Sequence, residues 1–139
     1  MPLNGSLEAW AKRGVLLLNT CLTVEDGQPA SHAKRGWEQL TDALLAEVAR
    51  TAPACVYMLW GAHAQAKTEL IARETAAQSA GFVGLREGAM PKRDALVLTA
   101  NHPSPFSALR LPLPFIGCGH FSQARDWLAQ RNSEMDWAL

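Results

Sequence analysis

The sequence Cys55-Val-Tyr-Met-Leu-Trp60, followed directly by Gly61, decides the fold predicted for this chain. A short, continuous apolar run that ends at a glycine is typical of a strand buried on both faces. Val15–Leu18 and Ala95–Thr99 are two further runs of this kind. Strands with both faces covered occur mainly in parallel sheets, so these runs predict a sheet with helices on each side.

Helical periodicity fills the segments between the runs. One predicted helix ends at Thr51-Ala-Pro53, and its apolar positions are Trp37, Leu40, Leu44, Leu45 and Val48. Gly61 opens a second helix that passes through Ala64, Leu70 and Ile71 and ends before Gly81, and a last helix covers roughly residues 120–130. The alternation predicts an α/β fold, with layered helices around a mainly parallel sheet, in a single domain over residues 1–139.

Composition excludes several classes of protein. The net charge is zero, so any contact with DNA has to come from local groups rather than from a basic field. The N-terminus has no signal pattern, and no apolar run approaches the roughly 20 residues that span a bilayer, which predicts a cytoplasmic protein without a membrane partner. Cys21, Cys55 and Cys118 lack the spacing of a metal site, so we expect reduced thiols and no metal.

Polar residues follow each predicted strand. Asn19-Thr20, Trp60-Gly61 and Asn101–Ser107 all come directly after an apolar run. In open α/β sheets, ligands bind beside the carboxyl ends of the strands. The three turns therefore predict one site at that edge of the sheet.

The segment His102-Pro-Ser-Pro105 is the most informative of these turns. Each proline fixes its own φ and holds the residue before it out of helical space, so His102 and Ser104 are predicted to be extended. A stiff loop of this kind presents an imidazole and backbone N–H groups without first having to order them. His102 either caps a backbone group at the strand end or acts as an electrophile or acid in the crevice.

The neighbouring polar and apolar residues also have two interpretations each. Ser104 and Ser107 either bind phosphates or hydrogen-bond to their own backbone. Phe106 either projects as a wedge that enters a base stack or folds back onto the core. Asn19 either reads an imide-like edge, where a carbonyl and an N–H lie side by side as in uracil, or bonds to main chain.

Motifs along almost the whole chain resemble those of family-1 uracil-DNA glycosylases. They are Asn4-Gly5 with Trp10-Ala11, Gly14-Val-Leu-Leu-Leu-Asn-Thr20, Leu22-Thr-Val24, Ser31-His-Ala33 with Gly36-Trp-Glu38, Leu59-Trp-Gly61 with His63-Ala-Gln65, His102-Pro-Ser-Pro105, Gly117-Cys118 with His120-Phe121, and Asp136-Trp137. The resemblance implies hydrolysis of the bond between uracil and deoxyribose in DNA, without a metal or an organic cofactor. It implies that Asn19 reads the uracil edge and that His102 donates to uracil O2. Ser104 and Ser107 would grip phosphates, and Phe106 would take the place of a wedge residue.

The chain also departs from that family. The motif Gly-Gln-Asp-Pro-Tyr-His, which supplies the water-activating aspartate, and the phenylalanine that stacks on uracil are absent. Ala62 stands where a serine is common, and Leu111–Pro114 resembles an insertion. The family's first strand, which is missing, would lie between two strands that are present. We therefore expect weak or no activity. The alternative is a non-catalytic half-protein that binds uracil or DNA, self-associates, or completes its sheet with a partner strand.

Overall fold

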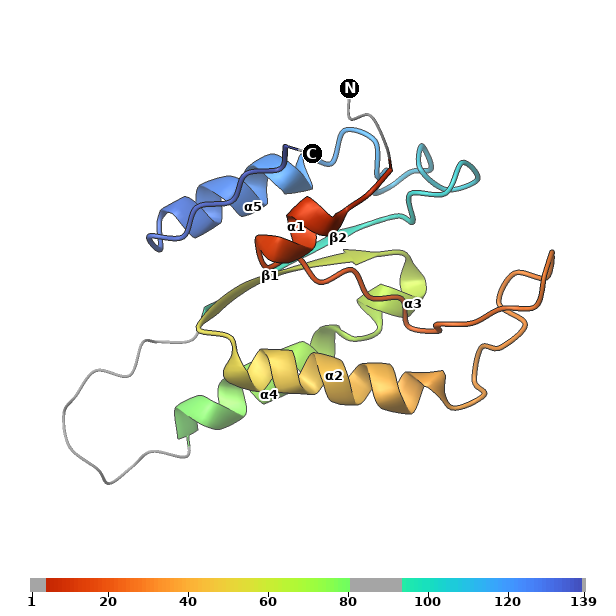
Figure 1. The fold of residues 1–139 in the computed structure, drawn as a ribbon, viewed down its shortest axis with the longest axis horizontal. Coiled ribbons are helices and arrows are strands. Elements are labelled where there is room, and N and C mark those ends of the chain that lie inside the picture. The colour runs from red at the N-terminus through yellow and green to blue at the C-terminus, as the bar shows by residue number, and fades with distance from the viewer. Residues whose placement is uncertain (1–4, 81–93, 139) are drawn as a thin grey trace.

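A computed structural model describes residues 5–80 and 94–138 of the chain. Its elements, in order, are α1 (Glu8–Lys12), α2 (Trp37–Thr51), β1 (Ala54–Trp60), α3 (Ala62–Gln65), α4 (Thr68–Ala80), β2 (Asp94–Ala100) and α5 (His120–Ala129). Figure 1 shows α2 and α4 on one side of the two strands, and α1 and α5 on the other. Within these residues no helix is long and apolar enough to cross a membrane. The sequence positions Asn4 and Gly81 lie outside the described residues.

The sheet pairs β1 with β2 in parallel. The register runs from Ala54 opposite Asp94 to Trp60 opposite Ala100. Both strands come from the apolar runs that predicted them, and the helices on each face confirm the predicted α/β layering. The carboxyl ends of the two strands are joined where the Gly61 N–H donates to the Ala100 carbonyl at 2.9 Å. The carboxyl ends of the two strands are therefore held side by side.

The main core lies between this sheet and the layer of α2 and α4. Its buried residues are Ala49, Tyr57, Leu59 and Ile71. Leu45 and Val48 of α2 pack against this cluster, as their spacing predicted. Leu40 and Leu44 were expected on the same face, but their exposed fractions are 48% and 44%. That expectation was wrong because the described residues place nothing over this part of α2.

The prediction of a strand at Val15–Leu18 was also wrong. These residues form no strand, and the exposed fractions of Leu16 and Leu17 are 61% and 55%. No backbone hydrogen bond joins them to β1 within residues 5–80 and 94–138. A strand that is buried on both faces needs a paired neighbour. The described chain supplies none beside these residues, so the apolar run stays extended and partly open to solvent.

The helix predicted to start at Gly61 is divided in two. The first part, α3, ends at Gln65, and α4 begins at Thr68. At the break the Lys67 N–H donates to the Ala64 carbonyl at 2.9 Å, and the Lys67 ammonium lies 2.8 Å from the Asp42 carboxylate on α2. The break thus coincides with a link between the two helical segments and α2.

An aromatic cluster joins the other face of the sheet to the two ends of the described chain. Rings of neighbouring members lie between 4.9 and 5.9 Å apart, and the members are Trp10, Trp60, Phe115, Phe121 and Trp137. Indole N–H groups add directional contacts: Trp10 donates to the Trp137 carbonyl at 3.0 Å, and Trp137 donates to the Phe121 carbonyl at 2.9 Å. Four motifs that are far apart in the sequence therefore meet beside β1.

Candidate active site

The loop after β2 is held closed by its own backbone. The Asn101 N–H donates to the Leu113 carbonyl at 2.7 Å, and the Asn101 side-chain amide donates to the Arg110 carbonyl. Inside the loop, the Ser107 and Ala108 N–H groups both donate to the Ser104 carbonyl at 2.9 Å. This role of Asn101 was not predicted from the sequence, although a polar amide directly after a strand was the available signal. These hydrogen bonds hold the two ends of the loop together.

His102 is exposed at the start of this loop, and one ring nitrogen has a partner. Its Nδ1 accepts a hydrogen bond from the Ser104 backbone N–H at 3.1 Å. Because Nδ1 accepts, the neutral ring carries its proton on Nε2. The two interpretations of His102 are therefore compatible: the ring caps a backbone group and still presents one N–H donor.

Gly61 lies against His102 and fixes its position relative to β1. The φ angle of Gly61 is +90°, which side chains rarely adopt, and a Cβ there would lie 3.1 Å from the His102 Cβ. Gln65 of α3 supports the same corner, since its side-chain amide donates to the Ala100 carbonyl at 2.8 Å. Ala62 contributes no hydroxyl here. The end of β1 and the start of the loop thus form one corner.

The remaining predicted DNA-contact residues share this loop with His102. Ser104 and Ser107 are half-buried, and no hydrogen bond to either hydroxyl is found in the part of the chain that the structure describes. Phe106 is 89% exposed, so it does not fold back onto the core. The loop therefore carries an imidazole donor, hydroxyl groups and an apolar tip on one short segment.

Asn19 lies on a different segment and is exposed. Nearby, the Thr41 hydroxyl of α2 donates to the Thr20 carbonyl at 3.0 Å and anchors this segment. Within the described residues, no hydrogen bond joins Asn19 to His102. The predicted uracil-reading residue and the predicted loop residues thus lie on separate segments of the chain.

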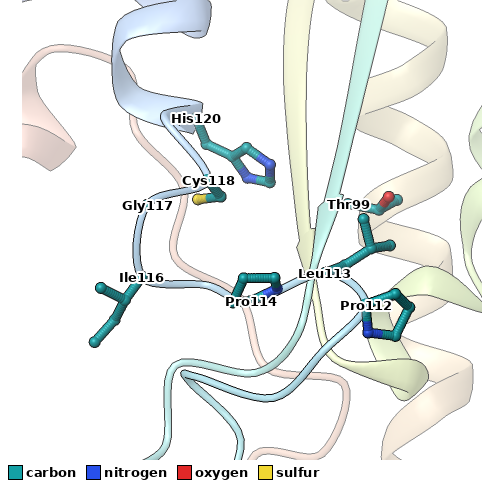
Figure 2. A pocket seen from close by; sticks show the side chains of 8 residues that line it. All are labelled: Thr99, Pro112, Leu113, Pro114, Ile116, Gly117, Cys118 and His120. Atoms are coloured by element: carbon teal, nitrogen blue, oxygen red, sulfur yellow. The ribbon is translucent and has the colours of Figure 1, made fainter.

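A cavity of about 230 Å³ lies beside the loop, between β2 and the start of α5. Figure 2 shows its lining residues: Thr99, Pro112, Leu113, Pro114, Ile116, Gly117, Cys118 and His120. None of the predicted site residues is among them. Three of the lining residues, Pro112, Leu113 and Pro114, belong to the Leu111–Pro114 segment that resembled an insertion.

His120 in this cavity wall is buried and has a structural partner. The Trp60 indole N–H donates to its Nδ1 at 3.0 Å, which ties the end of β1 to the start of α5. Burial lowers the pKa of His120 from its ordinary value of 6.5. Burial therefore favours the neutral ring, and this contact between distant motifs was not predicted from the sequence.

The loop between residues 21 and 36 is organised around Thr23. The Trp37 indole N–H donates to the Thr23 hydroxyl at 2.6 Å, and the same hydroxyl lies 2.8 Å from His32 Nδ1. Ser31 accepts the Glu25 backbone N–H at 2.8 Å rather than meeting His32. These bonds give the residues of three sequence motifs a structural role, and Ser31 and His32 do not form a hydrolase dyad.

The loop after β2 and the residues on either side of it contain no carboxylate. Between residues 95 and 125 the chain contains no aspartate or glutamate. The two acids that flank this stretch have other contacts: Asp94, at the start of β2, pairs with Arg131 at 3.1 Å, and Asp126, within α5, pairs with Arg125 at 2.9 Å. The loop can therefore donate hydrogen bonds, but it supplies no carboxylate base.

The fold and this loop define a class: α/β proteins that gather donor groups at the carboxyl end of a parallel sheet, where such proteins bind ligands. The family model of the Uracil DNA glycosylase superfamily matches residues 3–129. The chain belongs to that superfamily, which confirms the resemblance and the expected fold class.

Individual relatives agree with this family. A uracil-DNA glycosylase of Bordetella pertussis is 55% identical over 138 residues, which are 99% of this chain and 48% of the relative. One of Albidiferax ferrireducens is 58% identical over 127 residues, 91% of this chain and 47% of the relative. A solved structure of a mimivirus UNG variant in complex with UGI has a TM-score of 0.48 and 21% identity, over 72% of this chain and 35% of that one. The chain thus spans about half the length of its curated relatives.

Proposed function

We propose that this chain carries the leaving-group and DNA-gripping part of a uracil-DNA glycosylase site. The reaction would be hydrolysis of the bond between uracil N1 and the deoxyribose C1′ in DNA, as a step of base excision repair in the cytoplasm. The observation that carries the proposal is the His102 ring, whose Nδ1 accepts from the Ser104 N–H and leaves Nε2–H as a donor. Family membership supplies the substrate class.

His102 would act on the departing base. As the N1–C1′ bond breaks, its electron pair passes to uracil, and negative charge develops at O2. A fixed, neutral N–H donor stabilises such charge without reorganising. Removal of one donor of this kind costs about 3–4 kcal/mol of transition-state stabilisation. Water then adds to C1′, and its proton passes to solvent or to the uracil anion, so the products are free uracil and an abasic deoxyribose. Asn19 would read uracil O4 and N3–H through its amide.

The rest of the loop would hold the DNA. Ser104 and Ser107 offer hydroxyl groups to phosphates, which position the nucleic acid without reading its sequence. Phe106, with 89% of its surface exposed, would enter the base stack as the uridine flips out. No metal or organic cofactor takes part in these steps.

The activity of the 139-residue chain alone is proposed to be weak or absent. The loop after β2 carries no carboxylate to activate water, and the segment with Asn19 pairs with no strand among residues 5–80 and 94–138. The same observations favour a second candidate function. In that case the chain is a non-catalytic half-protein that binds uracil or DNA through the same loop.

Single-turnover uracil release from a single-stranded oligonucleotide tests the proposal. The chain would be compared with His102→Ala and with His63→Ala, a matched control because His63 is an exposed histidine on α3. Slow release that is lost only in His102→Ala supports the enzyme. Uracil-selective binding without release, measured by fluorescence anisotropy against a thymine oligonucleotide, supports the second candidate. If the folded chain shows neither uracil release nor uracil-selective binding, both candidate functions are contradicted.

A further inference from the structure

The cavity between β2 and the start of α5 contains none of the residues that we assign to DNA or uracil. Its lining comes from Thr99 on β2, from the loop segments 112–114 and 116–118, and from His120 at the start of α5. The volume is about 230 Å³, whereas an apolar cavity of roughly 150 Å³ is enough to hold benzene. One ring with a small substituent therefore fits this space.

Hydrogen bonds hold the loop wall of the cavity in place. The Leu113 carbonyl accepts from the Asn101 N–H at 2.7 Å, and the Ile116 N–H donates to the Ala108 carbonyl at 3.0 Å. The wall is therefore fastened both to the end of β2 and to the loop that follows it.

His120 gives the cavity a hydrogen-bond donor. The side chain is only 4% exposed, and the Trp60 indole N–H donates to its Nδ1 at 3.0 Å. Because an indole can only donate, Nδ1 accepts and the neutral ring carries its proton on Nε2. Burial lowers the pKa of His120 and so favours this neutral form.

The Nε2–H group of His120 has no partner of its own. No hydrogen bond from Nε2 is found within residues 5–80 and 94–138. Figure 2 shows the ring projecting from the start of α5 toward β2, which carries Thr99. A buried N–H without a partner is destabilising, so an acceptor placed in the cavity would satisfy it.

The rest of the lining excludes a charged ligand. Its larger side chains are apolar, and none of the lining residues is acidic or basic apart from the neutral His120; the apolar members are Pro112, Leu113, Pro114 and Ile116. An ionised ligand would lose its hydration here without gaining an opposite charge. Thr99 and Cys118 add a hydroxyl and a thiol, which can accept from a ring N–H.

We infer that this cavity is a binding site for a small, uncharged ring compound whose carbonyl oxygen or ring nitrogen accepts from His120 Nε2–H. Apolar walls with a few placed polar groups are typical of small-molecule sites. The site is separate from the loop residues that carry the proposed function, because His102, Ser104 and Phe106 are not in its lining.

Nuclear magnetic resonance tests the donor directly. The probe is 2-pyridone, a single uncharged ring with a carbonyl acceptor, added to the 139-residue chain with ¹⁵N-labelled histidine. We expect the His120 Nε2 resonance to move downfield as the carbonyl accepts its proton. Toluene has no acceptor and should cause no downfield shift, and benzoate should not bind because it is charged. Substitution of His120 would also remove the partner of Trp60, so the donor is tested by changing the ligand instead.

Two variants with matched side chains test the place of binding. Ile116→Trp puts a larger side chain into the lining at a residue that is 59% exposed, and it should weaken 2-pyridone binding by about tenfold or more. Leu109→Trp lies in the same loop outside the lining, at a 71% exposed residue, and should bind normally. His102→Ala should also bind 2-pyridone normally.

Thiol labelling gives a second readout on the unmodified chain. Cys118 lines the cavity and Cys21 does not, and both are half-buried. Bound 2-pyridone should slow the reaction of Cys118 with N-ethylmaleimide, as measured by peptide mass spectrometry, and leave Cys21 unchanged.

Four results would overturn the inference for a folded chain. They are an unchanged His120 Nε2 resonance at saturating 2-pyridone, equal binding by Ile116→Trp and Leu109→Trp, no selective protection of Cys118, and loss of binding in His102→Ala. The last result would place the ligand at the proposed uracil site instead. A chain that binds 2-pyridone but releases no uracil contradicts only the proposed activity.

Discussion

Gly61→Ala is the substitution whose effect the structure defines best. The new Cβ would adopt a φ of +90° and lie 3.1 Å from the His102 Cβ. The backbone strain costs about 1–2 kcal/mol. The contact is tighter than normal packing, and overpacking of this kind adds about 1–3 kcal/mol unless His102 moves. We expect Gly61→Ala to lower the free energy of unfolding by about 2–5 kcal/mol, or to displace the imidazole.

Gly14→Ala is the matched control for this experiment. Gly14 has the same φ of +90°, but a Cβ there would meet nothing within 4 Å. Gly14→Ala should therefore lower the free energy of unfolding by the backbone strain alone, about 1–2 kcal/mol. Urea unfolding of the two variants measures the difference, and binding of a uracil-containing oligonucleotide shows whether His102 has moved. Equal losses in stability together with unchanged DNA binding would refute the reasoning, because the contact between Gly61 and His102 would then be irrelevant.

Three further predictions concern single side chains. Burial lowers the pKa of His120 below 6.5, so at a pH between the folded and unfolded pKa values the unfolded chain binds more protons. The free energy of unfolding should therefore fall as the pH drops below about 6.5. His120→Gln should reduce the change of the urea midpoint between pH 5 and 7. Asn101→Ala should cost about 0.5–1.5 kcal/mol through its lost bond to the Arg110 carbonyl, and faster hydrogen exchange in residues 102–110 would report it. Phe106→Ala should change stability by less than about 0.5 kcal/mol, since the ring is 89% exposed, yet weaken binding to uracil-containing duplex DNA in anisotropy titrations.

The strands β1 and β2 and helix α5 could be predicted because their signals are local. Continuous apolar runs and helical spacing depend on burial that neighbouring elements of this chain do provide. Residues 15–18 carry an equally clear signal but form no strand. The pattern records burial on both faces, and the described residues offer no strand to pair with. Leu40 and Leu44 were misassigned for the same reason.

The position of the loop after β2 was predictable from the same local signals, whereas the roles of its residues stay predictions. The prolines around Ser104 predicted a histidine presented at the start of a loop, and His102 is exposed there. Contacts across the fold were beyond sequence reasoning. Neither the packing of Gly61 on His102 nor the bond from Trp60 to His120 follows from the spacing of those residues.

The most direct test of the central claim is uracil release by this chain in the presence of the part of the Bordetella pertussis relative that lies outside the match. The chain and the part of the Bordetella pertussis relative outside the match would be mixed at saturating concentration, with wild-type or His102→Ala chain, under single-turnover conditions. The account predicts release with the wild-type chain that is at least about 100-fold faster than with His102→Ala, in line with the loss of one stabilising donor. Equal rates in the two mixtures would contradict the assignment of leaving-group stabilisation to His102.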